Sequence, residues 1–153
     1  MLQTTLWIMI KDWKIFLWEK KRGFAKWVLN WVGWKQDKWE SIEECMIREA
    51  KEEIWIDINK NDLEYLWILH FYFDKKEMDQ DVHLFNIIKY SWNIIESEEI
   101  KPYWFDLDSI PYDKMWEDDK VWLPRVLKWE KNIEYNFYFD KDNWKMIKSE
   151  LIK

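Results

Sequence analysis

Short apolar runs alternate with polar turns along most of this chain, and one longer stretch is amphipathic with a helical period. Runs rich in branched and aromatic residues are typical of strands, and neighbouring runs joined by a short polar turn predict hairpins. The amphipathic stretch opens with a capping box, in which Ser41 is followed three residues later by Glu44, and this pattern predicts the start of a helix. We therefore expect a mixed sheet with one strong helix, built from strands at residues 4–10, 15–19, 64–73, 81–90, 103–105, 133–139 and 145–152 and helices at 42–54 and 118–128.

Length and charge narrow the class of protein. The 153 residues suffice for one domain, and since no linker or repeat interrupts them, we expect a single domain over residues 1–153. With 24 Lys and Arg against 30 Asp and Glu, the net charge of -6 argues against binding to duplex nucleic acid. The longest uncharged stretch, residues 1–10, is too short to span a bilayer. The single Cys45 excludes an intramolecular disulfide. We therefore expect a cytoplasmic protein that does not associate with a membrane, and we expect it to be a monomer.

Glycine is scarce and tryptophan abundant, and one explanation covers both anomalies. The chain has 2 glycines and 15 tryptophans, whereas ordinary usage of about 7% would give about eleven glycines. Asp12-Trp13 and Asn143-Trp144 resemble two-residue hairpin turns that need positive φ, and Trp55 follows the predicted helix where a left-handed cap favours glycine. Our hypothesis is that the gene comes from a lineage that reads UGA as glycine and that these codons were translated as tryptophan.

The hypothesis divides the tryptophans into two groups that the codons can test. Reading twelve of them as glycine brings glycine close to its ordinary usage. UGA is expected at these twelve positions and UGG at the other three. The positions assigned to glycine are Trp7, Trp13, Trp18, Trp27, Trp31, Trp34, Trp39, Trp55, Trp67, Trp92, Trp129 and Trp144, and the genuine tryptophans are Trp104, Trp116 and Trp122.

The predicted helix carries three glutamates, Glu49, Glu52 and Glu53, beside its apolar stripe at residues 42, 46, 50 and 54. Carboxylates at this spacing repel one another next to buried surface unless cations neutralise them. Carboxylate oxygens are the ligands that Mg²⁺ prefers, and Arg48 can pair with Glu52 or Glu44 along the helix. A solvated acidic face remains the alternative for this spacing alone.

The glutamates belong to a longer pattern. With Trp34 and Trp55 read as glycine, residues 34–56 follow G-x5-E-x7-R-E-U-x-E-E-x-G-U, where U is aliphatic. This pattern resembles the Nudix box of the Nudix hydrolases. The resemblance implies the Nudix fold, an α/β (α+β) architecture with a mixed β-sheet sandwiched between helices. The matching residues are Glu40, Arg48, Glu49, Ala50, Glu52, Glu53 and Ile56.

Beyond the box, essentially the whole chain resembles the MutT-type oxidised purine nucleoside triphosphatases, which sanitise pools of 8-oxo-dGTP and related nucleotides. The matches include K-K-R-G-F at residues 20–24, D-V-H at 81–83 and M-W-E-D-D at 115–119. Where mammalian members of the family carry a pocket methionine, just before the D-V-H run, this chain has Gln80. The resemblance implies a base pocket in which Asn30, Asp118 and Asp119 hydrogen-bond the purine edge, Trp116 stacks on the base, Phe71 and Phe73 line the walls, and Thr5 and Lys20 contribute.

Asp118 and Asp119 are also informative as an adjacent acidic pair. Burial and a neighbouring charge can keep one carboxyl protonated, so that the pair offers one donor and one acceptor to a base. An isolated Asp-Asp fits a solvated helix start equally well, and Trp116 beside the pair favours the pocket.

The resemblance further implies a metal-dependent hydrolysis that releases a nucleoside monophosphate and pyrophosphate. Since the triphosphate and the protein are both negatively charged, Mg²⁺, with Mn²⁺ as a substitute, is expected to bridge them. One glutamate acts as general base for the attacking water. Two alternatives stay open: a Nudix pyrophosphohydrolase for another nucleoside diphosphate derivative, and a non-catalytic nucleotide-binding module. The implied metal ligands are Gly33, Glu49, Glu52, Glu53 and Glu99, and the catalytic residues are Arg48, Glu49, Glu52 and Glu53.

Overall fold

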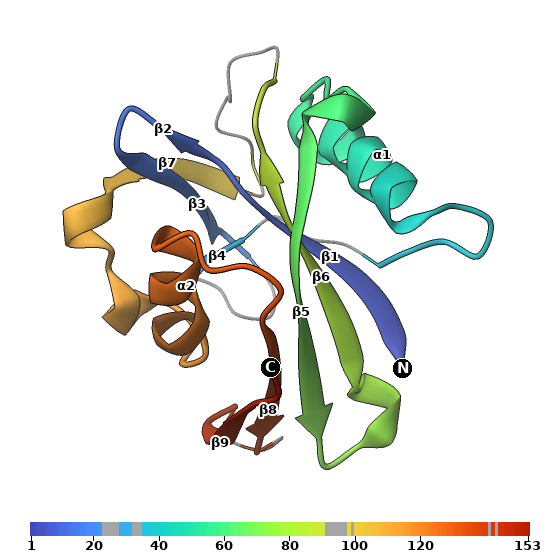
Figure 1. Ribbon diagram of the computed structural model, residues 1–153, viewed down its shortest axis with the longest axis vertical. Helices are drawn as coiled ribbons and strands as arrows, with labels where there is room; N and C mark the ends of the chain where they lie inside the picture. The colour runs from blue at the N-terminus through green and yellow to red at the C-terminus, as the bar shows by residue number, and fades with distance from the viewer. Residues whose placement is uncertain (23–27, 32–34, 91–97, 99, 141, 143) are drawn as a thin grey trace.

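The computed structural model describes residues 1–22, 28–31, 35–90, 98, 100–140, 142 and 144–153, with the backbone alone at 53, 54 and 100. Two α-helices and a set of strands make up the described fold, with short 3₁₀ turns between them (Figure 1). No described helix is both long and apolar enough to cross a membrane. The strands are β1 (Leu2–Ile8), β2 (Ile10–Lys11), β3 (Lys14–Lys20), β4 (Leu29–Asn30), β5 (Leu63–Phe73), β6 (Gln80–Ile87), β7 (Ile100–Asp106), β8 (Glu134–Phe139) and β9 (Met146–Leu151), and the helices are α1 (Ile42–Ile54) and α2 (Asp119–Leu127).

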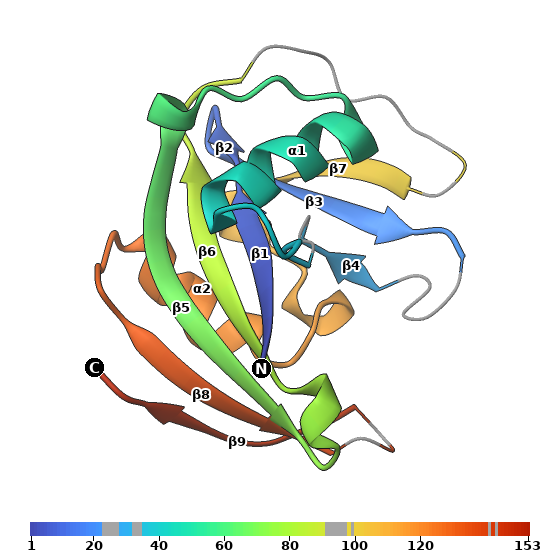
Figure 2. The same cartoon turned by 90° about the vertical axis from the view of Figure 1, so that its right-hand side faces the viewer.

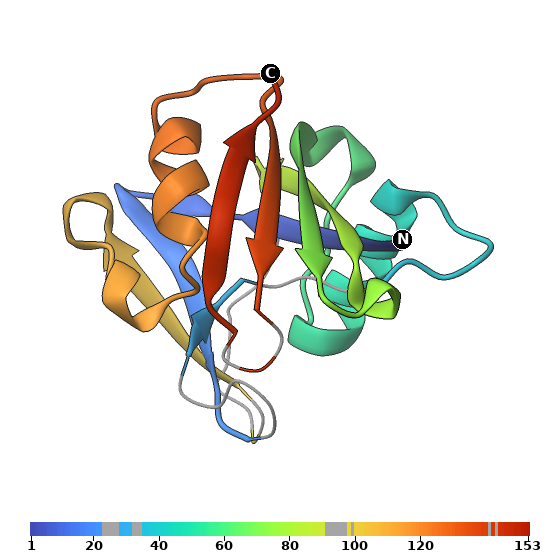
Figure 3. The same cartoon turned by 90° about the horizontal axis from the view of Figure 1, so that it is seen from below.

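A five-stranded mixed sheet forms the centre of the molecule, in the order β1-β6-β5-β8-β9. The β1–β6 and β5–β8 pairs are parallel, and the β6–β5 and β8–β9 pairs are antiparallel. Helix α1 covers one face of this sheet and α2 lies on the other side (Figures 1 and 2), an arrangement also seen from below in Figure 3. The predicted α+β class, with a mixed sheet between helices, is therefore confirmed.

A second, antiparallel sheet is built on β3, which pairs with β2 and β4 and also with β7. The prediction of a hairpin between residues 4–10 and 15–19 is wrong for most of its first strand. β1 ends at Ile8 and pairs in parallel with β6, and only β2 turns back onto β3. The reason is a long-range pairing that local patterning does not reveal, because the same run of residues serves two sheets.

Helix α1 begins and ends as the sequence predicts. The Ser41 hydroxyl accepts a hydrogen bond from the backbone N–H of Glu44, and the Glu44 carboxylate accepts one from the backbone N–H of Ser41, so the capping box is complete. At the other end Trp55 takes φ 60° and ψ 30°, and its N–H and that of Ile56 bond back to carbonyls of the last turn. This is the left-handed cap at which glycine is favoured.

The left-handed positions of the fold support the reading of tryptophan as glycine. Among the described residues, Trp13, Trp55, Trp129 and Trp144 have φ between 53° and 60°, a region that costs a non-glycine residue about 1–2 kcal/mol. All four are among the twelve positions assigned to glycine. Asp12, with φ 53°, completes the predicted two-residue turn with Trp13.

Hydrogen bonding of the buried indoles points the same way at two further positions. The Nε1 atoms of Trp7 and Trp18 are buried without a partner among the described residues, which is costly for a polar group. Trp122, assigned as a genuine tryptophan, instead donates from Nε1 to Asp118 Oδ2 at 3.0 Å. Trp31 and Trp67 also donate from Nε1, so this criterion does not argue for glycine there.

A histidine ties three strands of the five-stranded sheet together. His70 on β5 contacts Asp81 of β6 through Nδ1 at 2.6 Å and Glu134 of β8 through Nε2 at 2.7 Å. Burial alone would lower the pKa of His70, but the hydrogen bonds to the two carboxylates raise it above its ordinary value. His70 therefore cross-links neighbouring strands, and its protonated form is favoured by both carboxylates.

Candidate active site

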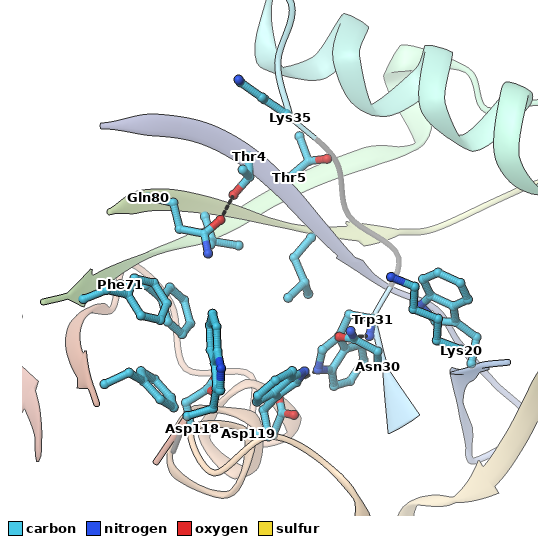
Figure 4. Close-up of a pocket in the computed structure, with 17 residues that line it drawn as sticks. Thr4, Thr5, Lys20, Asn30, Trp31, Lys35, Phe71, Gln80, Asp118 and Asp119 are labelled. Atoms are coloured by element: carbon cyan, nitrogen blue, oxygen red, sulfur yellow. Dashed lines mark hydrogen bonds between the residues drawn. The ribbon is translucent and has the colours of Figure 1, made fainter. Parts of the chain in front are cut away.

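A cavity of about 520 Å³ opens between the five-stranded sheet, strands β3 and β4, and the start of α2. Its volume lies in the range of small-molecule sites. Figure 4 shows Gln80, Phe71 and Thr4 on one side and Asp118 and Asp119 on the other. The structure brings all eight expected substrate residues to this cavity: Thr5, Lys20, Asn30, Phe71, Phe73, Trp116, Asp118 and Asp119.

The five-stranded sheet forms one wall of the cavity, and this wall is lined by every second residue of its strands, because side chains alternate between the two faces of a strand. Phe71 and Phe73 alternate along β5, and Phe71 lies opposite Gln80 of β6. The Phe71 ring stacks on Phe137 and Phe139 of β8, with ring centroids 5.3 and 6.0 Å apart. This wall is therefore a packed aromatic surface whose position is fixed by the core beneath it.

The opposite wall carries two buried carboxyls. Asp118 and Asp119 are 6% and 1% exposed at the N-terminal end of α2. Trp31 Nε1 donates to Asp119 Oδ1 at 2.7 Å, while Asp119 Oδ2 is buried without a partner among the described residues. A buried carboxyl oxygen with no protein partner, at the edge of a cavity, is an available group for a ligand.

Burial raises the pKa of both carboxyls. Burial raises the pKa of Asp118 to about 6, and the charge of Glu117 adds to this rise. Burial and the charge of Asp118 raise the pKa of Asp119 well above its ordinary value. Both carboxyls therefore keep a proton to higher pH than an exposed aspartate does, so the pair can present one donor and one acceptor.

The other expected substrate residues surround the same space. Asn30 accepts a hydrogen bond from the Trp31 backbone at Oδ1, at 2.8 Å, which leaves its NH₂ group to donate. Trp116 lies near Trp144, with ring centroids 6.3 Å apart. Lys20 lies beside Asn30 at the end of β3, and Thr5 is buried on β1 (Figure 4). Aromatic, amide and cationic groups are thus available around one ligand.

Arg48 organises the acidic side of α1. Its guanidinium forms two hydrogen bonds to Glu40, at 2.7 and 2.9 Å, and also donates to Glu49 and to Glu52. The expected pairing of Arg48 with Glu52 is present, whereas Glu44 serves the capping box. The hydrogen bond from Arg48 lowers the pKa of Glu40 to about 2, so this pair stays ionised throughout the physiological range.

The expected metal ligands are only partly within the described residues. Gly33 and Glu99 lie outside them, as does the side chain of Glu53, whose backbone belongs to α1. Glu49 and Glu52 are described, and their side chains are 12% and 58% exposed. Among the described residues no group of three or more His, Cys, Asp or Glu side chains could hold a metal ion. The chemistry of the described donors nevertheless fits a hard divalent cation, because Glu49 and Glu52 supply carboxylate oxygens on the side of α1 where both contact Arg48.

Several cavity residues were not expected from the sequence as site residues. Four of them lie on the same face of the sheet as the expected residues Phe71 and Phe73: Thr4 and Leu6 of β1, Val82 of β6 and Phe139 of β8. The period-two pattern within each strand identifies such a face, but only the strand order shows that the faces adjoin. Lys35, Trp18, Trp31 and Trp144 complete the lining.

Comparison with known proteins identifies the class that this fold and site define. A model of the NUDIX domain family matches residues 4–126, most of the chain. The chain belongs to the NUDIX domain family and is an enzyme, a hydrolase. Members of this family generally need divalent metal ions.

The relatives are consistent with this class. The chain is 34% identical to the oxidized purine nucleoside triphosphate hydrolase of Danio rerio over 131 residues, 86% of this chain and 83% of that protein. It is 33% identical to the protein of the same name from Mus musculus over 138 residues, 90% of this chain and 87% of that protein. The crystal structure of a mutator MutT protein from Bacillus halodurans matches with TM-score 0.85 at 22% identity, covering 99% of this chain and 98% of that one.

Proposed function

We propose that this hydrolase converts oxidised purine nucleoside triphosphates, of the 8-oxo-dGTP and 2-hydroxy-dATP class, to the monophosphate and pyrophosphate. It would thereby remove damaged nucleotides from the pool, as a cytoplasmic monomer. The observation that carries the proposal is the buried Asp118–Asp119 pair, one carboxyl of which has an oxygen without a partner, at the edge of a base-sized cavity. The names of the relatives in Danio rerio and Mus musculus support the same substrate class.

The acidic pair matches the edge of a guanine-type base. Protonated Asp119 can donate to a carbonyl oxygen such as O6, and ionised Asp118 can accept from a ring N–H such as N1–H. Both carboxyls are removed from water, so a base that leaves either one without a partner is disfavoured. Trp116 supplies an aromatic face for stacking, and the Asn30 NH₂ group supplies a further donor.

The glutamates of α1 serve the phosphate end of the substrate. Glu49, Glu52 and Glu53, with the Gly33 carbonyl and Glu99, would hold Mg²⁺, or Mn²⁺ in its place. When bound, the metal ion neutralises phosphate charge and makes the attacking water a better nucleophile. Arg48 keeps Glu49 and Glu52 in place through its hydrogen bonds. One glutamate accepts the proton of the attacking water, and the P–O bond that breaks releases the nucleoside monophosphate and pyrophosphate. Of the part of the chain that the structure describes, Lys20 and Lys35 line the cavity and can contact phosphate.

A substrate panel tests the proposal. Values of kcat/KM would be measured for 8-oxo-dGTP, 2-hydroxy-dATP, dGTP, dATP and ADP-ribose under one set of metal conditions. We expect the oxidised triphosphates to exceed their unmodified counterparts and ADP-ribose. Equal values for oxidised and unmodified purines would remove the substrate assignment, and a preference for ADP-ribose would assign the enzyme to nucleoside diphosphate derivatives instead.

A further inference from the structure

Strand β9 leaves one edge of the five-stranded sheet open. It is the last strand in the sheet order and pairs with β8 alone among the described residues, and Figure 2 shows it along the outer margin of the molecule. Ile152, just after β9, donates its backbone N–H to Glu134 of β8. Because the backbone groups of successive residues point to opposite edges of a strand, those of Ser149 and Leu151 face away from β8. An edge of this kind can pair with a further strand.

Exposed aliphatic side chains gather along this edge. Ile147 and Leu151 are 64% and 50% exposed, and Ile152 is 49% exposed. Apart from the tryptophans assigned to glycine, these three make up half of the large hydrophobic residues that are exposed in the described part of the chain. Apolar side chains that collect beside unpaired backbone groups are typical of a protein–protein contact surface.

The two charged residues of β9 lie on the other face of the strand from Ser149. Lys148 and Glu150 are opposite Tyr138 and Asn136 of β8, whereas Ser149 is opposite Phe137, whose side chain belongs to the core. The ammonium group of Lys148 lies 2.8 Å from a Glu150 carboxylate oxygen, and both side chains are about half exposed. Each strand therefore presents one positive and one negative charge beside its open edge.

This arrangement is complementary to a second copy of itself. When two β9 strands pair antiparallel about a two-fold axis at Ser149, Lys148 of each copy lies opposite Glu150 of the other. Leu151 of each copy then lies beside Ile147 of the other, on the apolar side of the contact. A shift of two residues in either direction would bring two copies of Lys148, or two copies of Glu150, directly opposite each other, and like charges in such pairs are destabilising. The charges thus favour one partner and one register.

We infer that two copies of this chain associate through antiparallel pairing of their β9 strands, which joins the two five-stranded sheets into one. The contact is small, because β9 has six residues and stable interfaces bury about 1,200–2,000 Å² in total. Association therefore belongs to micromolar and higher protein concentrations, and the chain is a monomer in a dilute turnover assay. No residue of β9 lines the described cavity, so pairing leaves each cavity open and does not depend on the proposed function.

Sedimentation equilibrium without nucleotide, at about 5–500 µM protein, tests the inference. We expect the wild-type protein to change from monomer to dimer across this range. Lys148→Glu gives each strand two glutamates and Glu150→Lys gives it two lysines, so either variant alone should raise the Kd at least about tenfold. An equimolar mixture of the two variants should associate again, because an acidic strand then meets a basic one. A protein that carries both substitutions should dimerise like the wild type.

Lys60→Glu is the matched control, since it reverses the charge of an exposed lysine on the 3₁₀ turn before β5 and should leave the Kd unchanged. Thermal unfolding shows whether each variant is folded, and Leu151→Lys, which should also raise the Kd, replaces one that is not. A wild-type protein that stays monomeric over the whole range would overturn the inference. A Lys148→Glu protein that dimerises as tightly as the wild type, or a mixture of the two charge variants that stays monomeric, would equally overturn it.

Discussion

Glycine at three exposed left-handed positions should stabilise this protein. Trp13, Trp55 and Trp129 have φ of 59°, 60° and 59°, and are 80%, 75% and 62% exposed, so removing their indoles sacrifices little buried surface. A non-glycine residue costs about 1–2 kcal/mol in this region, or about 3–6 kcal/mol for three. Glycine gives back about 0.5–1 kcal/mol at each position because it is more flexible in the unfolded chain. The triple glycine variant should therefore gain about 2 kcal/mol in free energy of unfolding, within a range of about 0–4.5 kcal/mol.

Circular dichroism is the suitable probe, because the substitutions remove fluorescent side chains. A gain of about 2 kcal/mol corresponds to a rise in Tm of about 4–8 °C for a chain of this size. Trp39→Gly is the matched control, since Trp39 is 89% exposed and is not among the described residues with positive φ. A triple variant no more stable than the Trp39→Gly protein would show that left-handed strain at these positions is not what glycine relieves. UGG codons at all twelve positions would separately refute the hypothesis that UGA encodes glycine.

Three further predictions concern charge and chemistry. Asp118→Asn should raise the free energy of unfolding at pH 8 but hardly at pH 4, and it should lower kcat/KM. The pKa of Asp118 rises from 3.8 to about 6 on folding, so the stabilising contribution of its protonated form is lost as the pH rises through this window. Denaturant titrations at both pH values check this, and equal effects of the substitution at pH 4 and pH 8 would contradict it. His70→Gln should lower the free energy of unfolding by about 1–3 kcal/mol at pH 6 and by less at pH 9. The pKa of His70 is raised in the folded protein, so its stabilising contribution is present below the ordinary pKa of 6.5 and is lost as the pH rises through the folded pKa. Urea titrations in which the loss does not depend on pH would contradict this. Glu53→Gln should lower kcat about 100- to 10,000-fold with little change in Tm, while Glu77→Gln, outside the site, should retain activity; comparable kcat values for the two variants would exclude a catalytic Glu53.

Local chemistry predicted the parts of the fold that depend on neighbouring residues. The capping box at Ser41, the left-handed cap at Trp55 and the turn at Asp12-Trp13 are each decided within a few residues, and the structure has all three. The division of residues 2–11 between two sheets was not predictable in this way. It depends on the parallel pairing of β1 with β6, whose residues lie far along the chain.

The candidate site likewise has features that the sequence predicted and features that depend on tertiary packing. The family resemblance named eight substrate residues, and the structure places all eight around one cavity. Sequence chemistry alone suggested that one of the adjacent carboxyls would be protonated, but whether the pair is buried depends on tertiary packing that no local pattern specifies. Gln80 was recognisable in the sequence as a departure from the family, yet its orientation toward the cavity required the position of Thr4 on the neighbouring strand.

We propose that the glutamates of α1 hold a divalent cation for hydrolysis of an oxidised purine triphosphate. The most direct measurement is product analysis of 8-oxo-dGTP incubated with the twelve-glycine protein at increasing Mg²⁺, by anion-exchange chromatography. We expect 8-oxo-dGMP and pyrophosphate in equal amounts, formed only when Mg²⁺ is present. Release of orthophosphate, or a rate that does not change when the metal is chelated, would contradict it.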